Sequence, residues 1–144
     1  MNTREIKIIE YNTAENWIRD FPSKNWCLII ISNLKNTNYY DEILRKSIDR
    51  NVGFIHAVGS QSKLIHDLAD EEILVRSVEN YPLPKHTILT TEIENFESGI
   101  WFGIYSTEND KSEIKEIIIL DVDKNRKEEI AKLINEFEKG YIPK

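Results

Sequence analysis

Two short apolar runs on either side of an amphipathic helix limit this chain to a small number of folds. Residues 26–32 (Trp-Cys-Leu-Ile-Ile-Ile-Ser) and 52–58 (Val-Gly-Phe-Ile-His-Ala-Val) are almost continuously apolar, as strands are when both faces of a sheet are covered. Between them, residues 40–50 carry apolar side chains at helical spacing. A strand, a helix of this length and a second strand form a crossover unit, which is normally parallel and right-handed.

The remaining segments extend this unit into a larger sheet. Further strands are predicted at residues 5–11, 86–91, 100–106 and 115–122, and further helices after Gly59, at 73–78 and from about 125 to 140. The sum is an α/β fold, a three-layer sandwich with a mostly parallel sheet of about six strands and helices on both faces. The strand pair within 86–106 is also compatible with an antiparallel edge. Because no linker or repeat divides the chain, we expect residues 1–144 to form a single domain.

Composition narrows the classes of function. The net charge is −6, whereas a nucleic-acid binder needs a basic face to neutralise phosphates. No apolar run approaches the ~20 residues that span a bilayer, and no signal peptide is apparent at the N-terminus. Cys27 is the single cysteine, so no internal disulfide is available. We therefore expect a cytosolic protein without nucleic-acid or membrane partners, whose acidity suits either a basic protein partner or simple solubility.

The turn after the second apolar run is one candidate binding site. Gly59, Ser60 and Ser62 lie between a predicted buried strand and a predicted helix. Ligands of open α/β sheets bind where strands end, and a helix N-terminus offers free N–H groups to an anion. The turn lacks the glycine pattern of a Walker or dinucleotide motif, so a capped helix behind a tight turn is the structural alternative.

The helix that follows this turn carries a second candidate. His66 and Asp70 are four residues apart, and Asp67 is three residues from Asp70, so neighbouring side chains share a helix face. Such a group suits metal coordination or acid–base chemistry, although it lacks the second histidine of a zinc helix; a solvated helix face is the alternative. Thr90 and Thr91 end a predicted strand, where their hydroxyls either face a ligand or bond loop backbone. We assign no metal and no cofactor to these residues.

A third candidate is a protein interface. Trp101 and Tyr105 lie on the predicted strand 100–106, and aromatic side chains dominate interface hot spots when such a strand is at an edge; core packing is the alternative. The preceding acidic segment supplies the rest of this candidate surface, with Glu92, Glu94 and Glu97.

Part of the chain resembles a family of small bacterial proteins classed as a domain of unknown function. The resemblance covers roughly residues 26–122. The matching motifs are Val58-Gly59, Ser62, His66-Asp67, Asp70, Leu89-Thr90-Thr91 and Trp101-Phe102. The chain has Ser62 where the family often has cysteine and Glu92-Ile93 where it has Trp-His. The resemblance implies no activity, substrate or cofactor, and these departures imply that a catalytic group at those places would be missing here.

Two functions follow from these observations. The first is a small protein-binding module, similar in role to an immunity protein, an antitoxin or a component of a bacterial defence locus. The second is a ligand-binding, metal-binding or hydrolytic domain that uses the Gly59–Ser62 turn together with His66, Asp67 and Asp70. Whether the chain is an enzyme is left open, with binding favoured because no complete catalytic motif is present.

Overall fold

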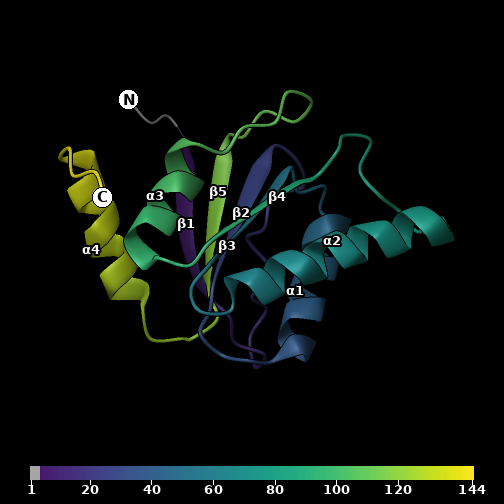
Figure 1. Ribbon diagram of the computed structural model, residues 1–144, viewed down its shortest axis with the longest axis horizontal. Helices are drawn as coiled ribbons and strands as arrows, with labels where there is room; N and C mark the ends of the chain where they lie inside the picture. Colours follow the sequence, from purple (N-terminus) through teal and green to yellow (C-terminus); the bar gives the residue numbers. More distant parts are fainter. Residues whose placement is uncertain (1–3) are drawn as a thin grey trace.

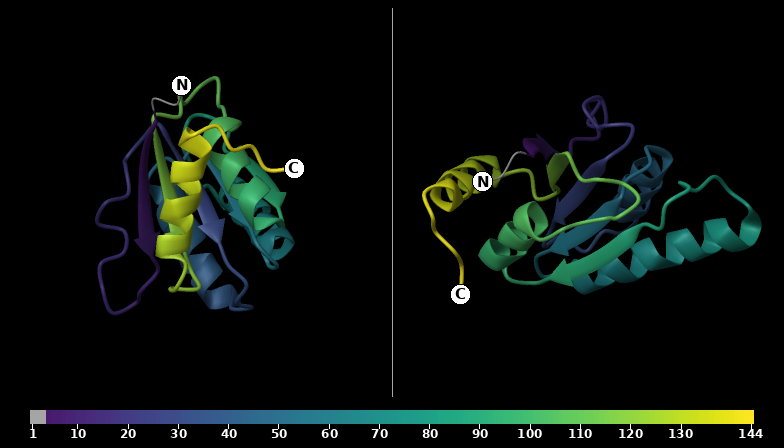
Figure 2. Two further views of the ribbon diagram at one scale, coloured as in Figure 1. Left: turned by 90° about the vertical axis from the view of Figure 1, so that its left-hand side faces the viewer. Right: turned by 90° about the horizontal axis from the view of Figure 1, so that it is seen from above.

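The computed structural model describes residues 4–144, which form one parallel sheet between two layers of helices (Figure 1). In chain order the elements are β1 (Glu5–Glu10), β2 (Trp26–Ile31), α1 (Thr37–Asp49), β3 (Phe54–Val58), α2 (Ser62–Glu79), β4 (Leu89–Ile93), α3 (Phe96–Tyr105), β5 (Glu116–Asp121) and α4 (Lys127–Glu138). The strand order is β1-β5-β2-β3-β4, and every neighbouring pair is parallel. Helices α1 and α2 cover one face of the sheet and α3 and α4 cover the other (Figure 2).

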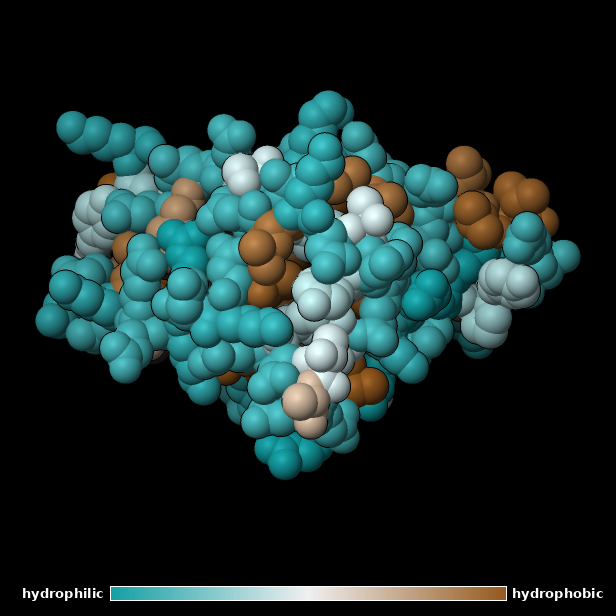
Figure 3. All heavy atoms as spheres, turned by 90° about the horizontal axis from the view of Figure 1, so that it is seen from below, coloured by the Kyte–Doolittle hydropathy of each residue, from teal (hydrophilic) through white to brown (hydrophobic). Residues whose placement is uncertain are grey.

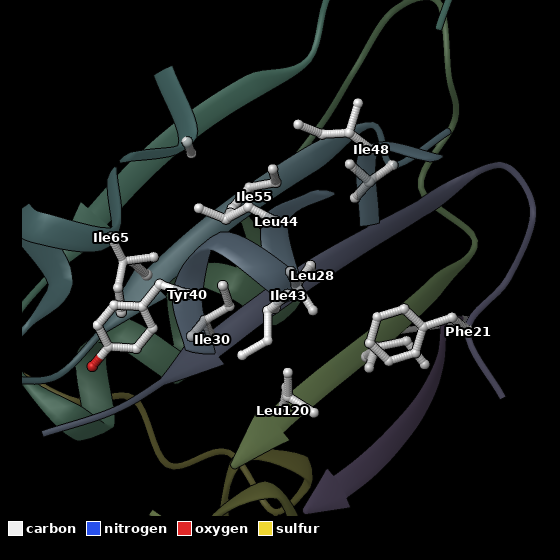
Figure 4. Close-up of a cluster of buried hydrophobic side chains, with 14 of the residues drawn as sticks. Phe21, Leu28, Ile30, Tyr40, Ile43, Leu44, Ile48, Ile55, Ile65 and Leu120 are labelled. Carbon is white, nitrogen blue, oxygen red and sulfur yellow. The ribbon is translucent and has the colours of Figure 1, made fainter. Parts of the chain in front are cut away.

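The sheet is built around β2, whose six residues are all buried. Its side chains alternate between the faces, as a pleated strand requires. Leu28 and Ile30 join the core under α1 and α2, which Figure 4 shows in close-up. Cys27, Ile29 and Ile31 join the core under α3 and α4. The apolar run is continuous because successive side chains of β2 enter two separate hydrophobic cores, one on each face of the sheet.

The helices α1 and α4 agree with the periodicity of the sequence. Helix α1 begins after Asn36, whose side-chain oxygen accepts a hydrogen bond from the backbone N–H of Tyr39 at 3.3 Å. The sequence predicts Asp123 or Asn125 as the cap of α4, but the helix begins at Lys127 and neither residue caps it. Instead the buried Asp121 carboxylate, at the end of β5, accepts bonds from the backbone N–H groups of Lys124 (3.1 Å) and Arg126 (2.8 Å).

The predicted strand at 100–106 is wrong, because this segment is helix α3. The alternation of large side chains around Trp101 suggested a strand, but the buried positions Gly99, Ile100, Gly103 and Ile104 recur at helical spacing. The sheet accordingly has five strands, and the antiparallel edge is also wrong because β4, the edge strand, pairs with β3 in parallel.

Two smaller boundaries also differ from the sequence prediction. Strand β4 begins at Leu89 and extends to Ile93, so residues 86–88 precede it. The second short helix predicted at 73–78 is the continuation of α2, which runs unbroken from Ser62 to Glu79. No helix within residues 4–144 combines the length and hydropathy needed to cross a membrane.

Gly103 provides a test of how closely α3 approaches the sheet. A Cβ atom at this position would lie 2.4 Å from Cδ1 of Ile29, so Gly103→Ala forces a rearrangement of the core. We expect a net loss of about 1–2 kcal/mol in the free energy of unfolding, because overpacking outweighs the gain of ~1 kcal/mol in helix propensity. Urea titration measures the change.

Ile29→Val supplies the matched background, since it removes Cδ1, the nearest atom to the new methyl group, and keeps Cγ1, which would lie at 2.8 Å. Gly103→Ala should cost less in this background than in the wild type. Equal costs in both backgrounds would show that contact with Cδ1 does not cause the loss.

Candidate functional site

At the usual ligand position of an open α/β sheet, polar groups of this chain hydrogen-bond to one another. The strand order reverses between β5 and β2, where ligands of such sheets bind beyond the carboxyl ends. Here the N–H and Nδ2 of Asn33 donate to the two carboxylate oxygens of Asp123, at 2.9 and 3.2 Å. The Asn33 Oδ1 atom accepts from the backbone N–H of Ser60 at 2.8 Å. These bonds join the segments after β5, β2 and β3 to one another.

The Gly59–Ser62 turn is part of the same closed arrangement. Gly59 has a φ of +109°, and a Cβ atom there would lie 2.5 Å from the Ser32 carbonyl oxygen, so close approach requires glycine. The N–H of Ser62 bonds the carbonyl of Gly59 at 3.1 Å, and the Ser62 side chain is buried. With the Ser60 amide also engaged, an anion would have to displace internal bonds, which favours a structural role for the turn.

His66 lies at the centre of a polar cluster between α2 and β4. Its Nδ1 is 3.0 Å from Oε1 of Glu92, and its Nε2 is 3.0 Å from Oγ1 of Thr90. The Thr90 hydroxyl donates to Oδ1 of Asp70 at 2.6 Å, while Oδ2 of Asp70 is 3.4 Å from Nε2 of His66. His66 and Asp70, four residues apart on α2, thus contact the side chains of Thr90 and Glu92 on β4. The contact between His66 and Glu92 is not predictable from the sequence pattern, because it depends on how α2 packs on β4.

The chemistry of this cluster is limited to proton transfer and hydrogen bonding. The carboxylates of Asp70 and Glu92 lie against opposite nitrogens of the His66 ring, so they do not converge on one point. Among residues 4–144 no group of three or more His, Cys, Asp or Glu side chains is arranged to hold a metal ion. Asp67 is separate from the cluster, since it is exposed and 3.5 Å from Nζ of Lys63.

Thr91 lies on the other face of the sheet from Thr90, beside a buried histidine. The Thr91 hydroxyl is 2.6 Å from Nδ1 of His56, and Nε2 of His56 donates to the Gly99 carbonyl at 2.9 Å. Burial lowers the pKa of His56 to about 4, partly offset by the bond to Gly99. His56 is therefore neutral in the folded protein, and Thr91 belongs to the core beneath α3 rather than to the His66 cluster.

The end of α2 carries a group of exposed apolar side chains. Leu74 and Val78, one turn apart, are 63 % and 72 % exposed, and Val75 and Tyr81 are also exposed. Figure 3 shows hydrophobic side chains at the right-hand end of the molecule, the end at which α2 projects in Figure 1. We call Leu74, Val75, Val78 and Tyr81 the apolar end of α2. The apolar pattern of residues 73–78 predicts a helix but does not show that α2 has apolar side chains on more than one face.

Arg76 fixes the last turns of α2 although their outer face is exposed. Its buried guanidinium contacts Glu72 at 2.8 Å and Asp49 at 2.9 Å, and it donates to the Pro82 carbonyl at 2.9 Å. The helix then ends at Asn80 with a φ of +59°. The apolar end is therefore held in place by polar contacts to α1 and to the segment that follows α2.

The residues predicted as a protein interface lie on different parts of the surface. Glu92 belongs to the His66 cluster, on the side of the sheet that α2 covers. Trp101 and Tyr105 are on α3, on the opposite side, where they line a groove with α4. Glu94 is exposed after β4, and Glu97 accepts a hydrogen bond from the Tyr141 hydroxyl.

The buried neutral His56 makes stability depend on pH. Its pKa is lower in the folded chain than the ~6.5 of an unfolded one, so the unfolded state binds more protons between these values. The contribution of His56 is present above pH ~6.5 and is lost as the pH falls through about 4, by up to roughly 3 kcal/mol. Urea titrations at pH 7 and pH 4.5 should show a larger loss for wild type than for His56→Gln. An equal loss of unfolding free energy between pH 7 and pH 4.5 in the two proteins would contradict a buried neutral imidazole at His56.

The family of the chain follows from a comparison with family models. A model described as "Domain of unknown function (DUF7684)" matches residues 6–137, from β1 to α4 and hence across every strand of the sheet. No curated protein and no solved structure matches the chain. The match agrees with the resemblance to a domain of unknown function that the sequence motifs indicated. The chain belongs to the DUF7684 family.

Proposed function

We propose that this chain is a small cytosolic protein-binding module that docks its partner on the apolar end of α2. The observation that carries this proposal is the exposure of Leu74 and Val78, which are large apolar side chains on adjacent turns of a fixed helix. Isolated exposed apolar residues are ordinary on a protein surface, whereas grouped ones mark interaction sites. Val75 and Tyr81 are exposed as well, so the exposed apolar side chains at the end of α2 are not isolated ones.

The apolar end of α2 offers side chains of the kind that form the energetic centre of an interface. Burying one Leu or Val side chain contributes about 1.5–3 kcal/mol. Tyrosine is among the residue types enriched at binding hot spots, and Tyr81 is 57 % exposed beside the helix end. Because Arg76 already holds the helix end, little conformational entropy is lost when a partner binds.

The surrounding charges favour a basic partner over a second copy of the chain. Glu71 and Glu79 are exposed on the same turns as Leu74 and Val78, and Asp67 and Asp70 lie one to two turns before them. Two copies would bring these carboxylates together, which the net charge of −6 makes less favourable still. A basic protein fits the surface, and an immunity-like, antitoxin-like or defence-locus role would supply such a partner.

The double substitution Leu74→Gln/Val78→Gln tests this proposal. Because both side chains are exposed, we expect the free energy of unfolding to change by less than about 0.5 kcal/mol. Binding of the partner should weaken by at least ~10-fold, since these residues are the proposed hot spot. Urea titration measures the change in stability, and a tagged pull-down from native-host lysate followed by affinity measurement with the captured protein measures the change in binding.

Leu34→Gln is the matched control, because Leu34 is 45 % exposed in the segment after β2 and not on α2. It should retain the partner with wild-type affinity. Equal retention by the control and by the α2 variant would place the docking surface elsewhere.

The geometry around His66 favours a second candidate function, general acid–base catalysis. Glu92 lies 3.0 Å from one ring nitrogen, and the other faces the Thr90 hydroxyl and the Asp70 carboxylate, so that a histidine held between two carboxylates is available to exchange a proton with a bound substrate. Under this alternative, His66→Gln abolishes hydrolysis of a simple ester such as p-nitrophenyl acetate, and Asp67→Asn, at a site outside the cluster, does not. Equal rates for wild type and both variants would remove this candidate.

A further inference from the structure

A groove on the opposite side of the molecule from α2 has the chemical features of a ligand site. It has a volume of about 1020 Å³ and lies between α3, α4 and β1. Ile6 and Ile8 of β1 are among its apolar lining residues, as are side chains of both helices. Ligand sites are typically lined by apolar and aromatic side chains with a few polar groups.

Four aromatic rings form a continuous row along this groove. Trp101 and Tyr105 of α3 have ring centroids 5.3 Å apart. Tyr105 is 6.3 Å from Phe137 of α4, and Phe137 stacks on Tyr141 at 6.1 Å with an interplanar angle of 12°. The Tyr141 hydroxyl bonds Glu97 at the start of α3, so the segment after α4 joins the two helices; Figure 2 shows this segment running alongside α3.

The electrostatics of the groove favour a cation. Helices α3 and α4 both end beside it, at Tyr105 and Glu138, and a helix C-terminus carries partial negative charge. The Glu138 carboxylate adds a full charge, and within residues 4–144 it forms no ion pair with a basic side chain. Glu138 lines the groove together with Tyr105, and burial and this nearby carboxylate raise the pKa of Tyr105.

Arg4 shows that this end of α3 already attracts a positive charge. Its guanidinium donates to the carbonyls of Ile104 (2.8 Å) and Thr107 (2.6 Å), in the last turn of α3 and just beyond it. Arg4 itself lines the groove, with its guanidinium hydrogen-bonded to these carbonyls, whereas the Glu138 carboxylate faces the groove and solvent.

We propose that this groove binds a small organic cation with a quaternary ammonium head, which lies against the ring row beside Glu138. Aromatic faces attract such cations through their quadrupoles, and the apolar lining accommodates the remainder of the ligand. This inference is independent of the protein-binding role proposed for α2, because the two surfaces lie on opposite faces of the sheet.

Titration with choline tests the proposal, with the neutral, nearly isosteric alcohol 3,3-dimethylbutan-1-ol as the matched probe. The chain has three tryptophans, and the indole N–H resonance of Trp101 reports on the groove. Trp17 and Trp26 pack on the other face of the sheet and serve as internal controls. We expect a saturable shift of the Trp101 resonance with choline, and binding of the alcohol weaker by about three- to tenfold or more.

Two variants separate charge from shape. Glu138→Gln should weaken choline binding by a similar factor of about three to ten, because it removes the carboxylate and keeps the side-chain size. Glu79→Gln, on α2, removes the same charge far from the groove and should leave choline binding unchanged. The proposal is overturned if choline produces no saturable shift at Trp101. Equal binding of choline and the alcohol, together with no effect of Glu138→Gln, would overturn it as well.

Discussion

Strand β2 is excluded from water along its whole length, and the rest of the fold depends on that burial. All six of its residues are fully buried, with β5 hydrogen-bonded on one side and β3 on the other. Parallel strands of this kind require helices on both faces, and the chain supplies α1 and α2 for one face and α3 and α4 for the other. Because β5 follows α3 in the sequence, the central pairing of β2 is complete only when the C-terminal half has folded.

The sequence predicted the parts of this fold that depend on local pattern. Strands β2 and β3, and helices α1 and α4, follow directly from apolar runs and helical periodicity. The prediction of a strand at residues 100–106 is wrong because the large side chains around Trp101 and Phe102 alternate along the sequence as those of a strand do. The spacing of Gly99 and Gly103, four residues apart, was the available indication of a helix that lies close to the sheet, since a Cβ atom at either would clash with β2 or β3 side chains.

In the candidate sites too, contacts within one helix could be predicted from the sequence, and contacts between elements could not. The approach of His66 to Asp70 is a property of one helix and could be predicted, whereas the contact of His66 with Glu92 depends on how α2 sits over β4. Thr90 and Thr91 look equivalent in sequence but face opposite sides of the sheet. The exposure of Leu74 and Val78 depends on how far α2 projects beyond its neighbours, which periodicity alone does not contain. At the usual ligand position, Asn33, Asp123 and Ser60 already bond one another, and the surfaces proposed for binding lie on the helices.

The most direct test of docking at the apolar end of α2 is site-specific photo-crosslinking. A photoreactive residue in place of Val78, compared with one in place of Leu34, reports which proteins contact each position in native-host extract. We expect one discrete adduct with a basic protein from position 78, suppressed by excess unlabelled wild-type chain, and no such adduct from position 34. The same adducts from both positions, or only a self-adduct from position 78, would contradict it.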